Sequence, residues 1–295
     1  MTALSRAVAL AAALLLVPAT AVPQDAGAKP PDAKPADAKP AGGEKKAPEP
    51  PKPPTLEEVK EFCKQYEDSL KKMTDEDAIA GVEKSRGWFA NPGTADDAKK
   101  EIVGLMKKVL EAKSRESLLE AACKALGDFG DDGVVLLKYA VDRAMGQKVP
   151  TSGVIRAGLP ALGKIASPKT ADVKFLTDLL KKEDEFIGDA ANALAGYGKA
   201  PGSVRRDIFE ELLKMSEGVF SKSEANDQPA KRRWNIWGTD VVEALQKVSR
   251  QNWQKPTEFR KWFNDKGEKG GKNPKAWADD PPPAPKPADP KGAGN

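Results

Sequence analysis

Apolar residues recur at intervals of three and four through the middle of the chain, over residues 55–265. One such series is Ile102, Val103, Met106, Val109 and Leu110, and another is Leu118, Ala122, Leu126 and Phe129. This spacing places the side chains on one face of a helix, and alternation with period two never persists long enough to indicate a strand. Four prolines, at positions 168, 201, 229 and 256, stand where new helices would begin. The pattern predicts an all-α fold.

Four segments of this region repeat one another: residues 118–127, 154–163, 186–195 and 237–246 align without gaps, with Ala-Leu at the eighth and ninth positions. Another amphipathic stretch precedes each segment (97–112, 131–145, 168–182 and 201–219), so the repeated unit is a helix pair. The last spacing is enlarged by a polar insertion at 221–228. A single pair cannot bury its apolar stripe, whereas stacked pairs can. The repeats therefore predict an elongated α-solenoid.

The residues inside the repeat explain how such helices could pack. A small residue at the fifth position (Ala122, Gly158, Ala190) is expected to let a neighbouring helix approach closely. The segment Val154–Gly163, whose Ala-Leu-Gly ending recurs at 125–127, resembles the second helix of HEAT-like repeats. The resemblance covers residues 97–250. Ala195 and Gln246 replace the terminal Gly, and Pro160 is expected to kink its helix.

The resemblance leads to a division of the chain. We expect about four HEAT-like pairs at 97–250, preceded by an N-terminal cap pair at 55–93 with helices at 55–72 and 75–88. Residues 251–265 form a C-terminal cap, completing a helical repeat domain over 55–265. A short Trp-rich segment like the one here also follows secreted bacterial HEAT-like arrays.

The first 21 residues have the pattern of a signal peptide. Arg6 precedes an apolar stretch at 7–17, and Ala19-Thr20-Ala21 is a small-x-small cleavage site. Eleven apolar residues are too few for the roughly 20 of a membrane-spanning helix. The pattern predicts export to the periplasm or outside the cell and no transmembrane span after signal removal; a retained N-terminal anchor is the alternative.

Proline gathers at the two flanks of the helical region. Of the 25 prolines, ten lie in 22–54 and seven in 266–295. These stretches contain few large apolar side chains and cannot offset the entropy lost on ordering. We expect a disordered Pro/Ala/Lys-rich linker at 22–54 and a disordered Pro-rich tail at 266–295.

The reactive side chains are few. The absence of His excludes Ser-His-Asp catalysis and His metal ligands. The two cysteines, Cys63 and Cys123, lie on apolar helical faces, which favours free thiols over a disulfide. No motif indicates a cofactor, a metal or a catalytic group, so a non-enzymatic protein is expected, and an enzyme of unknown type stays open.

The charge is balanced over most of the chain and basic in one segment. Residues 55–265 hold 35 basic and 35 acidic side chains, a poor match for nucleic acid. Residues 231–262 have a net charge of +5, and five of the six Trp follow residue 233. This segment is either a C-terminal cap, sealed by Trp253, Trp262 and Phe263, or a binding site for an anionic polymer. The polymer-binding residues would be Lys231, Arg232, Arg233, Trp234, Arg260 and Lys261.

Two functions of different class follow. The leading hypothesis is an exported non-enzymatic scaffold whose solenoid surface binds a protein partner in the cell envelope. If the second helices line the concave surface, as in HEAT-like proteins, the partner-binding residues are Glu120, Lys124, Arg156, Lys164, Asn192, Glu243 and Lys247. The alternative is a binder of an envelope polymer or anionic glycan through residues 231–263.

Overall fold

The computed structural model describes residues 52–112, 115–182, 184–267 and 269–278. The predicted signal segment 1–21, most of the linker 22–54 and the tail beyond residue 278 lie outside them. Within the described ranges all regular structure is helical and strands are absent. The predicted all-α class is confirmed.

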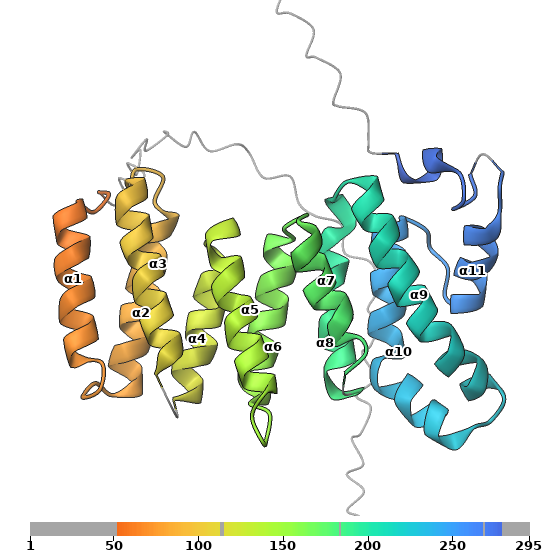
Figure 1. The fold of residues 1–295 in the computed structure, drawn as a ribbon, viewed down its shortest axis with the longest axis horizontal. Helices are drawn as coiled ribbons and strands as arrows, with labels where there is room; N and C mark the ends of the chain where they lie inside the picture. Colours follow the sequence, from red (N-terminus) through yellow and green to blue (C-terminus); the bar gives the residue numbers. More distant parts are fainter. Residues whose placement is uncertain (1–51, 113–114, 183, 268, 279–295) are drawn as a thin grey trace, which may run out of the picture. The chain divides into compact units, whose positions relative to one another are not determined.

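Eleven α-helices and two short 3₁₀ helices follow one another along the described residues (Figure 1). The α-helices are α1 Leu56–Ser69, α2 Asp75–Ala90, α3 Asp96–Glu111, α4 Glu116–Leu126, α5 Asp131–Met145, α6 Ser152–Ile165, α7 Thr170–Leu179, α8 Asp184–Ala195, α9 Gly202–Glu224, α10 Gln228–Ser249 and α11 Pro256–Asn264. The 3₁₀ helices are η1 Gly196–Lys199 and η2 Pro274–Trp277.

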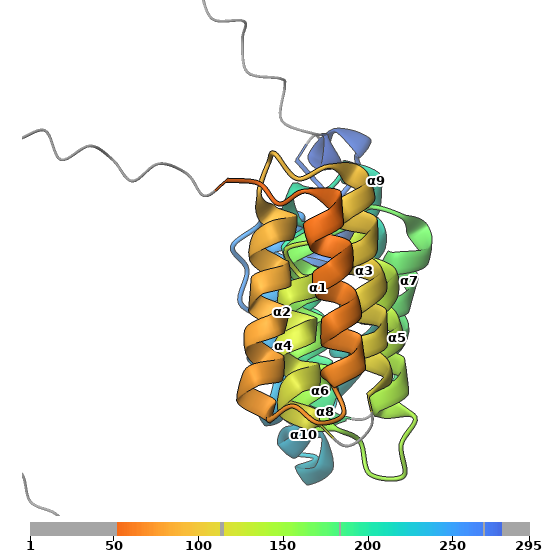
Figure 2. The same ribbon diagram turned by 90° about the vertical axis from the view of Figure 1, so that its left-hand side faces the viewer.

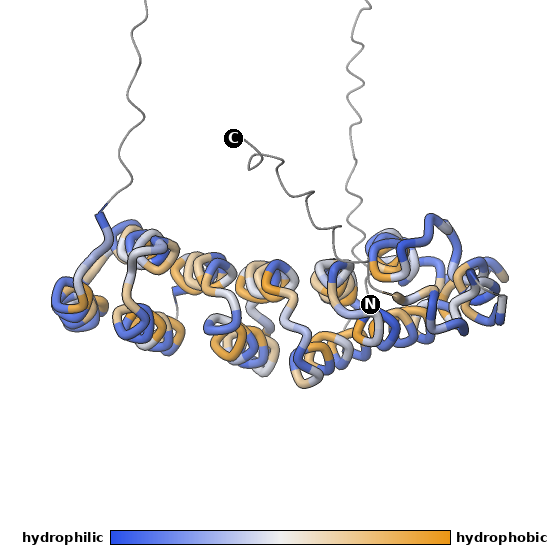
Figure 3. The backbone as a smooth tube through the Cα atoms, turned by 90° about the horizontal axis from the view of Figure 1, so that it is seen from above, coloured by the Kyte–Doolittle hydropathy of each residue, from blue (hydrophilic) through white to orange (hydrophobic). Residues whose placement is uncertain are grey.

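The first ten helices form two layers. Helices α2, α4, α6, α8 and α10 pack each against the next in one layer, and α1, α3, α5, α7 and α9 form the other (Figure 2). Seen end-on, the layers are two rows of helices (Figure 3). Successive helices α3/α4, α5/α6, α7/α8 and α9/α10 are the predicted pairs, and α1/α2 precede them. The α-solenoid architecture is therefore confirmed.

Polar side chains fix where several helices begin. Thr55 Oγ1 accepts a hydrogen bond from the Glu58 amide (3.2 Å), and Glu58 Oε2 accepts one from the Thr55 amide (2.7 Å). This capping box starts α1. Asp227 Oδ1 accepts a hydrogen bond from the Ala230 amide (2.8 Å) and starts α10.

The predicted polar insertion 221–228 is mostly helical, because α9 continues to Glu224 and α10 begins at Gln228.

Glycines at the ends of the second helices allow these helices to pack closely. A Cβ on Gly127 would lie 3.0 Å from Ala161 Cβ, and one on Gly163 would lie 2.6 Å from Ala193 Cα. In the third pair, where Ala195 replaces the motif glycine, Gly196 packs directly on the Gly163 backbone. The Ala-Leu-Gly motif therefore marks the contact between one second helix and the next.

The small residues at the fifth position are also buried. A Cβ on Gly158 would lie 2.6 Å from Val141 Cγ2, so glycine at this place gives α6 room to lie close to α5. Ala122 and Ala190 are fully buried. Pro160 lies on the exposed side of α6, which is continuous from Ser152 to Ile165.

The C-terminal end of the array is closed by an aromatic cluster around Phe209 of α9. Its ring centroid lies 5.5 Å from that of Trp262, 5.4 Å from that of Phe263 and 5.4 Å from that of Trp277. Trp262 and Phe263 thus seal the last pair as predicted. The expectation for Trp253 is wrong, because its side chain is 40% exposed.

The ordered C-terminal cap is longer than the predicted 251–265. Residues 269–278 fold back against α9, where Trp277 is 4% exposed and its Nε1 donates to the Gly271 carbonyl (2.7 Å). This part of the predicted tail is ordered because Trp277 supplies the large apolar surface that the proline-rich residues lack.

Candidate functional site

The seven predicted partner-binding residues all lie on the layer formed by α4, α6, α8 and α10. We call the outward side chains of this layer the even-helix face; it comprises Glu120, Lys124, Arg156, Lys164, Asn192, Glu243, Lys247 and the side chains that they contact. Six of the seven are exposed and Glu120 is half-buried. The repeat register read from the sequence therefore placed these residues on one layer.

Ion pairs and hydrogen bonds connect neighbouring helices across this face. Arg156 of α6 lies 3.2 Å from Glu185 Oε1 and 3.8 Å from Asp189 Oδ2 of α8. Asn192 Nδ2 of α8 donates to Asp240 Oδ1 of α10 (2.9 Å). These polar contacts thus run continuously from α6 to α10.

The carboxylates of the face differ in their electrostatic surroundings. Asp128, which follows α4, accepts hydrogen bonds from Lys164 of α6 and from Arg86 of α2. These two cations, Lys164 foremost, lower the pKa of Asp128. Burial raises the pKa of Asp189, although the nearby Arg156 opposes the shift. Asp128 is thus held ionised between two helices, whereas Asp189 is partly desolvated.

The predicted set divides into bridging and unpaired side chains. Arg156, Lys164 and Asn192 are used in contacts between helices. Glu120, Lys124, Glu243 and Lys247 make no ion pair or side-chain hydrogen bond within the described part of the chain, and the last three point to solvent. The unpaired residues are free to meet charges on another molecule.

The tryptophans of the basic aromatic segment, residues 231–263, and the nearby Trp277 mostly face inward. Trp237 is fully buried, and its indole N–H has no hydrogen-bond partner among the described residues. Trp262 and Trp277 are buried against Phe209. Trp234 is half-buried, with its ring 5.0 Å from that of Phe220. Only Trp234 and Trp253 of this group therefore reach solvent.

The cations of the same segment are partly neutralised. Arg233 Nε lies 2.8 Å from Asp184 Oδ1, and Arg260 forms a two-bond pair with Glu217 at 2.8 and 2.5 Å. Glu217 raises the pKa of Arg260. Lys231 Nζ donates to Asn226 Oδ1 (2.6 Å). Arg232 and Lys261 are exposed and unpaired within the described ranges. Two of the five predicted cations are thus available to an anionic polymer without breaking a contact.

The two cysteines are both free thiols. Burial raises the pKa of Cys63 to about 11 and that of Cys123 to about 12. Both stay protonated near neutral pH, a poor state for nucleophilic or redox chemistry. Across the described residues, no group of three His, Cys, Asp or Glu side chains is arranged to bind a metal.

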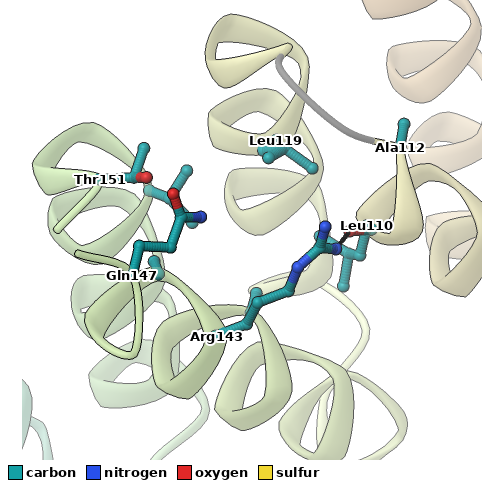
Figure 4. Close-up of a pocket in the computed structure, with 9 residues that line it drawn as sticks. Leu110, Ala112, Leu119, Arg143, Gln147 and Thr151 are labelled. Carbon is teal, nitrogen blue, oxygen red and sulfur yellow. Dashed lines mark hydrogen bonds between the residues drawn. The ribbon is translucent and has the colours of Figure 1, made fainter. Parts of the chain in front are cut away.

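A pocket of about 370 Å³ lies between α3, α4, α5 and α6 (Figure 4). Leu110, Leu119 and Val154 provide apolar wall, while Arg143, Gln147 and Thr151 provide polar groups. Arg143 Nη1 donates to the Leu110 carbonyl (2.5 Å), which directs the guanidinium toward α3. Sequence reasoning missed this pocket, because its walls come from four separate helices and their connections.

No protein-family model, curated protein or solved structure matches the chain. None of the helices in the described ranges is long and apolar enough to span a membrane.

Proposed function

We propose that this protein is an exported, non-enzymatic scaffold that binds a protein partner through the even-helix face of a HEAT-like α-solenoid. The observation that supports this most directly is the common placement of the seven outward residues on four adjacent helices. They combine both signs of charge, since Lys124 and Lys247 alternate with Glu120 and Glu243. Mixed charges on one extended surface suit a folded protein with complementary charges better than a uniform polyanion.

The HEAT-like assignment draws on the close contacts between second helices. Gly163 packs on Ala193, and Gly127 packs on Ala161, at the Ala-Leu-Gly positions of the resemblance. Stacking of this kind produces the extended binding surfaces of solenoid proteins. The proposal of export depends on the signal-like segment 1–21, and N-terminal sequencing of protein recovered outside the cytoplasm would test it.

The binding proposal is tested best with the unpaired lysines. Reversing Arg156 or Lys164 would also remove contacts to Glu185 or Asp128, so a loss of binding would have two explanations. The double variant Lys124→Glu/Lys247→Glu changes the even-helix face without breaking any described ion pair. Its control is Lys107→Glu/Lys214→Glu, which makes the same charge change at exposed positions of α3 and α9 in the other layer.

The measurement is crosslinking of the full chain in its native cells, followed by mass spectrometry of the captured proteins. We expect a discrete partner whose recovery falls at least tenfold, about 1.4 kcal/mol of binding free energy, in the Lys124/Lys247 variant and is unchanged in the control. Equal recovery with both variants would show that the even-helix face does not bind the partner.

A further inference from the structure

A second pocket, of about 320 Å³, lies beside α10 and the residues that follow the helix. Its wall includes Trp234, Thr239 and Glu243 from α10 and Asn252 and Gln254 from the connection to α11. Gln246 Nε2 donates to the Trp253 carbonyl (2.9 Å) and thereby holds this connection against α10. The pocket is thus bounded by a helix and a tethered loop.

An indole fixed in place forms one wall of this pocket. A Cβ on Gly238 would lie 2.6 Å from Trp234 Cδ2, so the ring rests directly on the helix backbone. Its ring centroid lies 5.0 Å from that of Phe220 and 5.5 Å from that of Trp237, at interplanar angles of 63° and 72°. Glycine inside a helix is unfavourable relative to alanine, and here it makes room for the ring. Trp234 is therefore a rigid, half-exposed aromatic surface.

Unpaired polar groups surround the indole. The side chains of Thr239, Glu243, Asn252 and Gln254 make no hydrogen bond or ion pair within the described residues, and the Trp234 N–H likewise makes none. Gln246 uses its amide N–H toward Trp253, which leaves its Oε1 as an acceptor. The pocket thus offers hydroxyl, amide and carboxylate groups, both donors and acceptors, beside the indole of Trp234.

From this arrangement we propose that the pocket binds a neutral or amino-sugar unit of a glycan. A pyranose ring has an apolar C–H face that can lie on an indole and a rim of hydroxyls that need both donors and acceptors. The lining contains the Glu243 carboxylate and no Lys or Arg side chain. A uronic acid would meet like charge there, whereas an uncharged sugar would not and a protonated amino sugar would be attracted.

This site shares Glu243 with the even-helix face and Trp234 with the basic segment 231–263, but it differs from both in the ligand proposed for it. It does not depend on the proposed binding of a protein partner. Binding of an uncharged sugar should also hardly change with ionic strength, whereas binding of an anionic polymer to Arg232 and Lys261 would weaken as salt rises.

The test presents the full chain to an array of neutral, amino-sugar and uronic-acid oligosaccharides, at 0.05 and about 0.5 M salt, a range over which exposed charges become strongly screened. Calorimetric titration of each retained oligosaccharide then measures affinity. We expect retention on neutral or amino sugars and at least tenfold weaker binding, about 1.4 kcal/mol, in Trp234→Ala. The variant Asn252→Ala/Gln254→Ala should lose binding to a similar extent, and because it alters only exposed loop side chains, its folding is not in question.

The matched control is Ile236→Ala, an exposed residue of α10 that does not line the pocket, and it should bind like the wild type. Absence of wild-type binding to every sugar would overturn the proposal. So would binding confined to uronic acids, or wild-type affinity in the Asn252/Gln254 variant.

Discussion

The guanidinium of Arg205 in α9 donates a hydrogen bond to the backbone carbonyl of Trp277, with Nη2 and O 3.0 Å apart. The same fully buried side chain donates to the carbonyls of Ala200 (3.0 Å) and Val248 (3.1 Å). One arginine therefore joins the residues before α9, the end of α10 and the last described segment of the chain.

Replacing Arg205 by Met should destabilise the domain by about 3 kcal/mol, because several buried carbonyls would lose a charged donor. Urea unfolding, followed by far-UV circular dichroism, measures the change. The neighbouring Arg206→Met is the control; Arg206 is partly exposed and paired with Glu210 one turn away, so its loss should cost under about 0.5 kcal/mol. Equal losses of stability in the two variants would contradict the conclusion that Arg205 holds the three segments together.

The closure of the C-terminal cap also depends on Gly202. A Cβ at this position would collide with the Trp277 carbonyl, so Gly202→Ala should displace residues 274–278 and shift tryptophan emission to longer wavelength. Gly218, in the same helix, has open space around its Cα. We expect Gly218→Ala to stabilise the domain by about 0.5–1 kcal/mol and to leave the emission unchanged. An unshifted spectrum for Gly202→Ala would mean that the segment tolerates the methyl group.

The repeat register can be tested at Leu162, the ninth residue of its segment, which is 4% exposed. Leu162→Ala should cost about 2–5 kcal/mol, because it removes buried apolar volume from the contact between helices. Val135→Ala in α5, at a residue that is 73% exposed, is the comparison and should change stability by less than about 0.5 kcal/mol. A loss below that value at Leu162 would place it outside the stacked core.

The two cations that contact Asp128 predict how the stability of the fold depends on pH in acid. Because Lys164 and Arg86 lower the pKa of Asp128 in the folded state, the ionised carboxylate stabilises the fold above its unfolded pKa of about 3.9. This stabilisation is lost as the pH falls through the lower folded pKa. Asp128→Asn should therefore be about 0.5–1 kcal/mol less stable at pH 7.

Chemical denaturation of the wild type and of Asp128→Asn across pH 2–7 checks this expectation. The difference in stability should remain constant near neutrality and shrink as the pH falls through the lowered folded pKa of Asp128, below which the carboxyl is protonated in both states. A difference that persists unchanged at pH 2 would show that the side chain acts through shape and not through charge.

The two thiols should become reactive when the protein unfolds. At pH 8 the raised pKa values of about 11 for Cys63 and about 12 for Cys123 leave little thiolate in the native protein. A thiol reagent should modify Cys123 only after denaturation, and both residues should be modified in denaturant without reductant. Protection of both under those conditions would indicate a disulfide.

The repeat architecture could be predicted because the same spacing of apolar and small residues recurs in several segments of the chain. Ala-Leu pairs at the same positions of each repeat predicted the second helices. The same repeat positions predicted that Lys124 and Lys247 face outward. The glycine of the motif could be recognised as well, since only a missing side chain lets Gly163 meet Ala193.

The contacts that depend on distant residues could not be predicted in this way. Nothing in the composition of 231–263 distinguishes an inward Trp237 from a half-exposed Trp234. The partners of Asn192 and Arg205 lie 48 and up to 73 residues away in the sequence. The Gly- and Lys-rich residues 266–276 before Trp277 lack large apolar side chains, as the proline-rich tail does, so the sequence places the end of the ordered cap too early, at residue 265.

The distances along the chain between packed helices also set an order of folding. Helices α1 to α8 make their main contacts within their own or neighbouring pairs, so each finds these partners soon after they are synthesised. Arg205 instead needs the Trp277 carbonyl, 72 residues further along the chain. In a chain that folds during synthesis, the C-terminal end is therefore completed last, and a chain that stops before Trp277 lacks one of the carbonyls that Arg205 requires.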